Sequence, residues 1–577
     1  MLEPQSRATL TDQLRPPAGF ALEHAVGTTF TLSLDSALAI PLAFAAQRLA
    51  VDDPIGVLDA VRRAASRIDI FAQAGQVSIA TPATDLVAFL EPMVHPVGVR
   101  TGIFHPKIWF LEYSRGEERA YRFVCSSRNL TADRSWDTVV TLDGVAGGGG
   151  EARTRNLPLS RLLRAMPDLA VIPLTSTRLA RIEALATQWE TIEWEMPDDV
   201  KDVAFHVWGN GRRPELDVSG KRALLISPFV SDAGLAELRR GTRTDSHLVS
   251  RAETLNVLTE QPKLETWVLD EAADPLDDQP AQAEALHGLH AKVFVFDRWD
   301  GAHVFMGSLN ATDAALRQNV EVLVELTGNL NRLGVEATRT ALGSLITPHI
   351  RTAPDDTADD QVALRLEGAL RRVATIPFHA RVRAGDAYSV EVWTEAPPKM
   401  PDEIDVSWHL LTRPATVIPG LPGSPEQPSV VTRLELADVT PYVIVTARQG
   451  DVRRTTVVLA SLEGDPDDRR EAVLARHLST PGALLRLLML MLELAGVSID
   501  APGGGVGWSR LGAGADGSGL FEALTRAVAS EHSALPDVQR IVRYVSEHKQ
   551  EALPDGFAEL WRVVWAAYKA RAGVSNG

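Results

Sequence analysis

Cysteine is almost absent from this sequence, and so are long apolar runs. Its 577 residues include one cysteine, Cys125. A single thiol excludes an internal disulfide framework and any zinc site built from several cysteines. No stretch of about eighteen uncharged apolar residues occurs, which is what a membrane-spanning helix needs. The apolar segment near residue 485 is shorter and carries Arg486 and Glu493, so it predicts a buried helix.

The N-terminal residues lack the basic start and apolar core of a signal peptide. Together with the single cysteine, this predicts a cytoplasmic protein that does not bind a membrane. Apolar residues make up 45% of the chain and charged residues 23%, which is ordinary for a globular protein. A chain of this length is expected to form three or four domains.

Positive charge is also in short supply. The chain has 58 Lys and Arg against 75 Asp and Glu, a formal net charge of −17. Proteins that hold nucleic acid by charge alone are usually basic. The acidic balance argues against tight, non-specific DNA binding by the whole surface. It still allows a local basic cleft, and it leaves room for a partner protein that delivers the substrate.

One stretch, residues 287–326, concentrates side chains that can handle phosphate. The run AKVFVFD alternates as a strand does, so His290 and Lys292, two residues apart, point to the same face. HVFMGS predicts the next strand, and Asn310 follows its end. NVEVLVEL predicts a third strand that supplies Glu321. Neighbouring strand ends therefore bring together an imidazole, an ammonium, an amide and a carboxylate.

The same layout occurs earlier, in residues 98–144. His105 and Lys107 precede a predicted strand, and Asn129 follows the next one. The first copy departs from the second in its acid, because Asp137 lies three residues closer to Asn129 than Glu321 lies to Asn310. Two copies at matching offsets are hard to reach by accidental core packing, so we expect one site built from both.

The pattern HxKxxxxD, followed by GSxN and a strand with Glu, resembles the HKD motif of the phospholipase D superfamily. Members need two such motifs, one from each of two similar halves, at one active site. The resemblance implies an α/β fold in which two phospholipase D-like αβα sandwich halves form a pseudo-dimer. It also implies a covalent phosphohistidine, usually on the histidine of the first half. The chain looks most like the prokaryotic nuclease branch, which includes restriction and phage-defence nucleases.

Cleaving a phosphodiester without a metal requires a nucleophile, a proton donor and cations for the phosphoryl oxygens. Imidazole suits the first two tasks. The resemblance favours His105 as nucleophile and His290 as general acid and then base, although the residues alone leave this choice open. Glu321 is expected to orient His290, while Asp297 and Glu112 are expected to form structural ion pairs. The predicted catalytic residues are His105, Lys107, Asn129, His290, Lys292, Asn310 and Glu321, and the predicted substrate-binding residues are Ser127, Ser308, Arg251 and Asp137.

Alternating strands and helices predict the two halves at residues 1–205 and 206–375. Short strands separated by Pro and Gly turns predict a small β-sandwich at 376–463. Amphipathic segments predict a helical domain at 464–577. The C-terminal modules are candidates for binding a partner or gating the site.

We therefore predict a metal-independent phosphodiesterase without a cofactor. The leading hypothesis is a DNA nuclease of anti-phage defence, working with a partner such as an ATPase or helicase. Two alternatives stay open: a phospholipase D-type lipid hydrolase, and a non-catalytic nucleic-acid-binding subunit of a larger complex. The sequence leaves open DNA versus RNA, strandedness and the oligomeric state.

Overall fold

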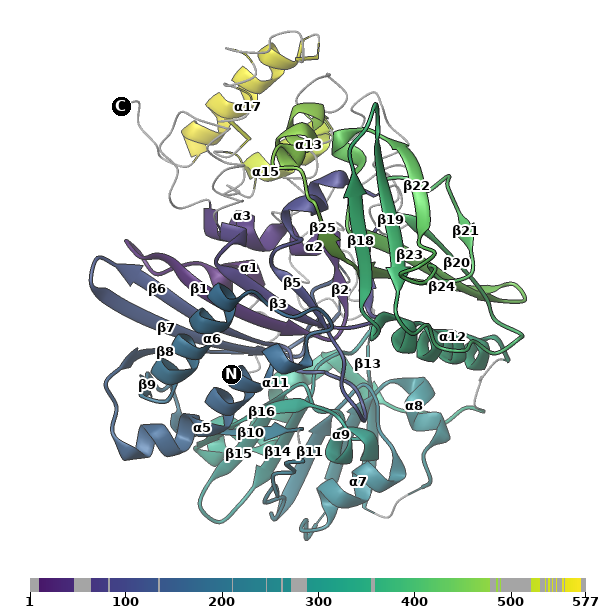
Figure 1. The fold of residues 1–577 in the computed structure, drawn as a ribbon. Helices are drawn as coiled ribbons and strands as arrows, with labels where there is room; N and C mark the ends of the chain where they lie inside the picture. Colours follow the sequence, from purple (N-terminus) through teal and green to yellow (C-terminus); the bar gives the residue numbers. More distant parts are fainter. Residues whose placement is uncertain are drawn as a thin grey trace. The chain divides into compact units, whose positions relative to one another are not determined.

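The computed structural model divides the described residues into two compact units (Figure 1). Unit 1 comprises Met1–Leu32, Asp69–Gln76 and His95–Leu364, and unit 2 comprises Ser33–Ile68, Val77–Val94 and Arg365–Gly577. The four-part division expected from the sequence stays a prediction. The structure describes residues 10–45, 64–80, 83–132, 135–209, 211–244, 246–260, 263–270, 288–353, 358–477, 484–485, 488, 520–529, 535, 538–539, 542, 546, 553–554 and 556–571.

The first sheet of unit 1 has seven strands in the order β5-β3-β1-β6-β7-β8-β9. From β1 to β9 through β6, neighbouring strands run antiparallel. Two helices follow β8 in the chain, α5 (Gly150–Ala165) and α6 (Ser176–Trp189). The strands are β1 (Ala21–Thr29), β3 (Ile68–Gln73), β5 (Val94–Val97), β6 (Ile108–Arg115), β7 (Glu118–Ser126), β8 (Val139–Ala146) and β9 (Ile192–Trp194).

The second sheet of unit 1 has eight strands in the order β10-β16-β15-β14-β11-β12-β13-β17. They are β10 (Val200–Trp208), β11 (Arg222–Ile226), β12 (Ser246–Ser250), β13 (Leu264–Leu269), β14 (Val293–Asp297), β15 (Ala302–Gly307), β16 (Glu321–Gly328) and β17 (Ile346–Pro348). The helices are α7 (Asp232–Arg239), α8 (Ala252–Val257), α9 (Asp313–Arg317), α10 (Leu330–Leu333) and α11 (Val335–Leu342).

The two sheets share one strand order. Read outward from β6 and β14, one side of each sheet begins with a meander of three consecutive strands, β6-β7-β8 and β14-β15-β16, with β9 and β10 as the next strands. On the other side lie β1-β3-β5 and β11-β12-β13. The strands predicted from AKVFVFD, HVFMGS and NVEVLVEL are β14, β15 and β16. The repeated motif therefore occupies matching strands of two matching sheets.

Apolar side chains cover both faces of the second sheet. In β11, Ala223 and Leu225 join a cluster with residues of α7, α8 and α9, while Leu224 and Ile226 join a cluster with residues of α10, α11 and the first sheet. Successive strand residues point to opposite faces, so an uninterrupted apolar run marks a sheet that is buried on both sides. Such a framework holds the strand ends rigidly.

A glycine ends β15 because nothing larger fits. Gly307 has φ of +154°, and a Cβ there would lie 2.3 Å from the carbonyl oxygen of Val322 and 3.2 Å from Cys125 Sγ. The first copy has Ser126 at the matching strand end, where its hydroxyl accepts a hydrogen bond from the backbone N–H of Arg128 at 2.8 Å. Each copy thus makes the turn after its second strand in its own way.

Unit 2 contains two four-stranded sheets, ordered β22-β19-β18-β25 and β21-β20-β23-β24. The strands are β18 (Phe378–Arg383), β19 (Tyr388–Thr394), β20 (Asp405–Leu410), β21 (Ile418–Pro419), β22 (Ser429–Leu434), β23 (Tyr442–Gln449), β24 (Val452–Leu459) and β25 (Ser461–Glu463). Helix α13 (Arg469–His477) carries Arg469, which is 1% exposed and pairs with Glu91. The shorter elements nearer the N-terminus are α1 (Leu10–Leu14), β2 (Leu32–Ser33), α2 (Leu34–Ala37), α3 (Ala39–Ala45), β4 (Val77–Ser78) and the 3₁₀ helix Asp85–Phe89.

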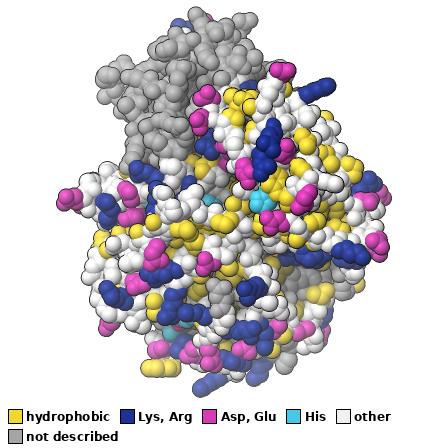
Figure 2. All heavy atoms as spheres, in the orientation of Figure 1, with side chains coloured by type: hydrophobic (Ala, Val, Ile, Leu, Met, Phe, Trp, Pro, Cys, Tyr) yellow, Lys and Arg dark blue, Asp and Glu magenta, His cyan; other side chains and the backbone are white. Residues whose placement is uncertain are grey.

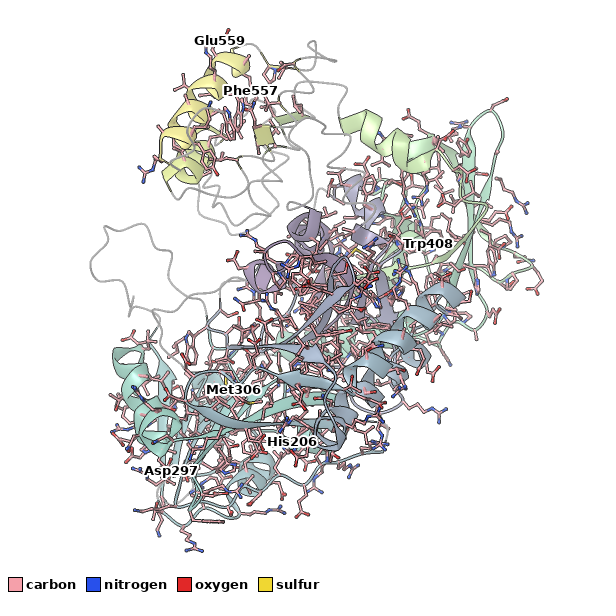
Figure 3. All side chains as sticks on the ribbon, turned by 90° about the vertical axis from the view of Figure 1, so that its left-hand side faces the viewer. His206, Asp297, Met306, Trp408, Phe557 and Glu559 are labelled. Atoms are coloured by element: carbon pink, nitrogen blue, oxygen red, sulfur yellow. The ribbon has the colours of Figure 1, made fainter. Side chains whose placement is uncertain are left out.

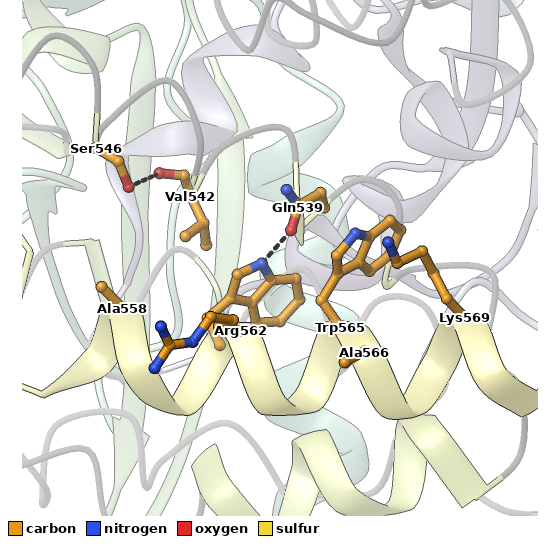
Figure 4. A pocket seen from close by; sticks show the side chains of 9 residues that line it. Gln539, Val542, Ser546, Ala558, Arg562, Trp565, Ala566 and Lys569 are labelled. Carbon is orange, nitrogen blue, oxygen red and sulfur yellow. Dashed lines mark hydrogen bonds between the residues drawn. The ribbon is translucent and has the colours of Figure 1, made fainter. Parts of the chain in front are cut away.

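The remaining described helices are α12 (Ala358–Ala374), α15 (Leu520–Ala529) and α17 (Phe557–Arg571). Helix α17 borders a cavity of about 360 Å³ (Figure 4), whose lining includes Trp561, Arg562 and Trp565. The indole of Trp561 donates a hydrogen bond to Gln539. The predicted apolar helix near residue 485 lies largely outside the described residues. Among the helices that the structure describes, none has the length and apolar character to cross a bilayer.

Candidate active site

The two motif copies interlock through their backbones. The N–H of His105 donates to the carbonyl oxygen of Val320 at 3.0 Å, and the N–H of His290 donates to that of Trp136 at 3.0 Å. Parallel bridges join Phe104 to Val320 and Trp136 to Leu289. The residues before each histidine therefore pair with the residues before the acid of the other copy. This reciprocal pairing brings both copies to one place within unit 1.

His105 is held by a carboxylate from the second copy. Its Nδ1 lies 2.9 Å from Oε2 of Glu321, which is fully buried. Ser308 donates to the same oxygen, and Asn319 Nδ2 donates to Oε1 at 3.0 Å. A carboxylate only accepts, so Nδ1 of His105 carries the proton and Nε2 is the nitrogen left for chemistry. The expected pairing of Glu321 with His290 is wrong, because the interlock sets the start of β16 against the segment that ends in His105.

His290 is held through a hydroxyl. Its Nδ1 lies 2.9 Å from Oγ of Ser135, and this hydroxyl donates to Oδ2 of Asp137 at 3.4 Å. The other carboxylate oxygen of Asp137 accepts from Ser127 at 2.9 Å. Ser135 is a site residue that the sequence reading missed, since a lone serine nine residues beyond the end of β7 carries no spacing signal.

Asp137 occupies the place in the first copy that Glu321 occupies in the second. Ser127 Oγ accepts from the N–H of Thr138 at 2.9 Å, and Ser308 Oγ accepts from the N–H of Val322 at 3.0 Å. The acid precedes that N–H in both cases. The three-residue offset in the sequence arises because the second copy inserts α9 between its Asn and its acid. The carboxylate of Asp137 accepts from Ser127 and Ser135, and its expected role in binding substrate stays a prediction.

Ser127 and Ser308 were expected to donate to the phosphoryl group. Their side chains are buried, 1% and 0% exposed, and each hydroxyl donates to the acid of its own copy. A hydroxyl has a single proton to donate. These serines therefore position the carboxylates, and their expected contact with substrate stays a prediction.

The two lysines are buried together. Lys107 and Lys292 are 3% and 4% exposed, and each ammonium donates to the carbonyl oxygen of the histidine two residues earlier, at 3.2 and 2.8 Å. Burial and then the charge of Lys292 lower the pKa of Lys107 well below its usual range. Burial lowers the pKa of Lys292 to about 8. Two desolvated ammonium groups that repel each other form a site that an anion would stabilise.

His105 is neutral near pH 7. Burial lowers its pKa to about 4, against the opposing effect of the Glu321 charge. The ring of Phe30 meets it edge-on, with centroids 5.2 Å apart, and also lies 5.9 Å from the Lys107 ammonium. This apolar wall contributes to the low-dielectric surroundings that disfavour the imidazolium. A neutral ring with its proton on Nδ1 is the form that can act as a nucleophile.

Three further predicted residues are Asn129, Asn310 and Arg251. Asn129 Oδ1 accepts from the N–H of Thr31 at 3.3 Å, which leaves its amide nitrogen as a donor. Asn310 Oδ1 is buried and has no hydrogen-bond partner among the described residues. Arg251 donates through Nε to the carbonyl oxygen of Leu289 at 3.1 Å, and its guanidinium lies 4.9 Å from the centre of the Phe229 ring. After burial, the charge of Arg251 also lowers the pKa of Lys292.

The motif acids lie away from this cluster, as expected. Asp297 ends β14, five residues after Lys292, or about 16 Å along a strand. It pairs with Arg222 at 2.8 Å and accepts from the N–H of Val335 at 2.8 Å. Figure 3 labels Asp297 and also Met306, which lies near the site end of β15. Glu112 pairs with Arg119 at 3.6 Å. Both acids make structural contacts.

Basic and acidic side chains are interspersed over the described part of the face in Figure 2, in keeping with the acidic composition. Across the described residues, no three His, Cys, Asp or Glu side chains gather in a way that could hold a metal ion.

No protein-family model matches the chain, and no curated protein does. Solved structures with some likeness include yeast tyrosyl-DNA phosphodiesterase, at 13% identity and a TM-score of 0.36 over 56% of this chain and 87% of that one. Polyphosphate kinase from Porphyromonas gingivalis has 12% identity and a TM-score of 0.32, over 63% and 51%. Phosphatidylserine synthase from Haemophilus influenzae has 11% identity and a TM-score of 0.31, over 63% and 89%.

Proposed function

We propose that this chain is a metal-independent phosphodiesterase that cleaves DNA through a covalent phosphohistidine. One observation carries the proposal: two histidines, each with Nδ1 anchored by an acid directly or through a hydroxyl, share one site with two buried lysines. Phosphoryl transfer needs a nucleophile, a proton donor and fixed cations for the phosphoryl oxygens. The site contains all three, contributed by both motif copies.

His105 is proposed as the nucleophile. Its pKa of about 4 keeps the ring neutral, and its direct bond to Glu321 fixes the proton on Nδ1. Nε2 attacks the phosphorus, and the bond from phosphorus to the leaving oxygen breaks with its electron pair on that oxygen. His290, which must start protonated, gives the Nε2 proton to the leaving group. Lys107, Lys292 and the amides of Asn129 and Asn310 bind the non-bridging oxygens.

The second half-reaction restores the site. Water attacks the phosphorus of the phosphohistidine, and His290 takes one of its protons. The bond between phosphorus and Nε2 of His105 breaks, and the electron pair returns to the ring. The products are a phosphomonoester and an alcohol, and His290 is protonated for the next cycle.

DNA is proposed as the substrate over lipid because the cations sit beside ring faces that suit bases. The Arg251 guanidinium lies over the ring of Phe229, which is 49% exposed. Exposed aromatic and guanidinium faces hold nucleobases without regard to sequence. Such groups offer little to a diacylglycerol chain. We also propose that unit 2 binds a partner protein of a defence system.

The test is direct. Purified full-length protein is given single- and double-stranded DNA, RNA and phosphatidylcholine vesicles side by side, with EDTA throughout. The proposal expects DNA cleavage in EDTA that His105→Gln and His290→Gln each abolish, with DNA binding retained. After acid quenching under conditions that preserve phosphoramidates, 5′-labelled or 3′-labelled DNA should leave label on wild-type protein and none on His105→Gln. Cleavage of lipid alone would refute the nuclease assignment, and binding without turnover on any diester would favour a non-catalytic subunit.

A further inference from the structure

The two histidines are anchored in different ways although the backbone around them is the same. His105 contacts the carboxylate of Glu321 directly at 2.9 Å. His290 contacts the hydroxyl of Ser135 at 2.9 Å, and the carboxylate of Asp137 lies beyond that hydroxyl. Both acids accept from a buried serine of their own copy at the same backbone position. The two copies therefore differ in the acid, Glu321 or Asp137, and in the group that contacts the histidine directly.

The different lengths of the Asp137 and Glu321 side chains account for this difference. Aspartate is one methylene shorter than glutamate, about 1.5 Å along the chain. In the second copy the longer acid, Glu321, contacts its histidine at 2.9 Å, and in the first copy, which has the shorter Asp137, the Ser135 hydroxyl contacts the histidine at 2.9 Å. Ser135, two residues before Asp137 and 6% exposed, puts its Oγ between that acid and His290. The Ser135 hydroxyl thus connects the shorter acid, Asp137, to His290.

Proton counting fixes the direction of this chain of hydrogen bonds. A carboxylate only accepts, and a hydroxyl has one proton to give. The proton of Ser135 goes to Asp137, so its oxygen accepts from Nδ1–H of His290. We propose that Ser135 is the positioning residue for His290: it holds the proton on Nδ1, turns Nε2 toward the substrate and carries the influence of Asp137 to the ring.

This inference rests on the proposed function for its kinetic consequence. A ring paired directly to a carboxylate holds its charge strongly, which suits the nucleophile that must carry positive charge in the phosphohistidine. A ring reached through a neutral hydroxyl holds its proton less tightly and can release it to a leaving oxygen. Ser135 thus makes the two chemically similar histidines unequal.

The variants are Ser135→Ala and the double variant Ser135→Ala/Asp137→Glu. The double variant removes the hydroxyl and lengthens the acid, so that the carboxylate can reach His290 as Glu321 reaches His105. Ser160→Ala is the matched control. Ser160 is fully buried in α5, and its hydroxyl lies 2.8 Å from the carbonyl oxygen of Ala186 and 3.1 Å from the carboxylate of Glu190, away from the site.

Two diesters separate a proton-transfer defect from general damage. A p-nitrophenyl ester has a leaving group that departs without a proton, and a nucleoside ester needs one. In the first turnover, Ser135→Ala should release p-nitrophenolate at a rate within about threefold of the wild-type rate. It should release the nucleoside about 10–100-fold more slowly than wild type does, which is the range of general acid catalysis. KM should stay unchanged, the double variant should regain at least half of the lost factor, and Ser160→Ala should match wild type.

A structural role for Ser135 predicts another pattern. Both esters would then slow equally, with a lowered Tm, and lengthening Asp137 would not restore the rate. Either that pattern, or a Ser135→Ala variant that behaves as wild type on both esters, overturns the inference.

A spectroscopic measurement keeps this test separate from the proposed activity. In ¹⁵N-histidine-labelled protein, at a pH where His290 has lost its second proton and with its signals assigned by their absence in His290→Gln, the neutral ring should show a single Nδ1–H tautomer that becomes mixed in Ser135→Ala. If the protein cleaves no diester but the tautomer shifts, the proposed function fails and the positioning role stands. If diesters are cleaved and the tautomer is unchanged in Ser135→Ala, the positioning role fails alone.

Discussion

Replacing Glu321 with glutamine should disable the site, because neither orientation of the new amide satisfies its neighbours. With the amide oxygen toward His105 and Ser308, the NH₂ group faces Asn319 Nδ2, so two donors meet where 3.0 Å now separates donor from acceptor. Asn319 cannot turn over at no cost, since its Oδ1 accepts from the N–H of Ile103 at 3.2 Å. The opposite orientation sets the NH₂ group against Nδ1 of His105 and forces the proton onto Nε2.

The size of the effect follows from these two orientations. A donor facing a donor in a fully buried site costs about 1–3 kcal/mol of stability. The second orientation also produces the wrong tautomer, in which the nucleophilic nitrogen is blocked by its own proton. Loss of the correct tautomer in other histidine-dependent enzymes lowers turnover about 10⁴-fold. We expect Glu321→Gln to lose about 2 kcal/mol in urea unfolding and about 10²–10⁴-fold in kcat/KM on a labelled oligonucleotide in EDTA.

Glu325→Gln is the matched control on the same strand. Glu325 is held by two histidines, with Oε2 2.7 Å from His206 Nε2 and Oε1 2.6 Å from His303 Nδ1, and it lies outside the site. The control should lose comparable stability and keep its turnover. The reasoning is refuted if Glu321→Gln stays within twofold of wild type, or if the two variants lose activity equally.

Three further outcomes follow from the same contacts. Because burial holds the pKa of His105 at about 4, the neutral nucleophile persists below the usual pH range of an imidazole, and the acid limb of kcat/KM should lie near pH 4; an acid limb near 6.5 would contradict this. Asp297→Asn should cost about 1–2 kcal/mol in urea unfolding by weakening the pair with half-exposed Arg222, with kcat unchanged. Arg251→Ala should raise KM several-fold and lower the salt slope of DNA binding by about one; an unchanged slope would remove Arg251 from the DNA contact.

The sequence was enough to find the site. The repeated spacing of His and Lys identified both pairs, but the expectation that His290 and Lys292 lie on a strand is wrong, because His105 and Lys107 precede β6 and His290 and Lys292 precede β14. The choice of acid could not be predicted, because it depends on the interlock of the two copies. His105 and Glu321 are 216 residues apart and meet through the bridge of Phe104 to Val320.

The role of Ser135 could not be predicted from sequence spacing for a related reason. Its role depends on its contacts with His290 and with the shorter acid of the first copy, Asp137, and these contacts arise from the packing of the folded chain. The early, shorter Asp137 was the available signal, because a carboxylate that falls short of a ring needs a bridging group. Ser127 and Ser308 follow the second strand of each copy, and the motif spacing alone assigned them to the substrate. Their hydroxyls donate to Asp137 and Glu321, and these contacts form only in the folded chain.

An acidic chain can hold a phosphodiester if the anion supplies the charge that keeps the lysines protonated. Burial lowers the pKa of Lys292 to about 8, so near pH 8 about half of the ammonium is lost in the empty site. A bound phosphoryl anion favours the charged form and raises that pKa, so binding should take up about half a proton on Lys292 at pH 8 and almost none at pH 6. Uptake by Lys107, whose pKa is lowered further, would add to this value. Calorimetric titration of a phosphorothioate dinucleotide in buffers of different ionisation enthalpy measures the uptake directly, and Lys292→Met should reduce it. Proton release, or uptake that does not change between pH 6 and 8, would show that the buried lysines do not receive the anion.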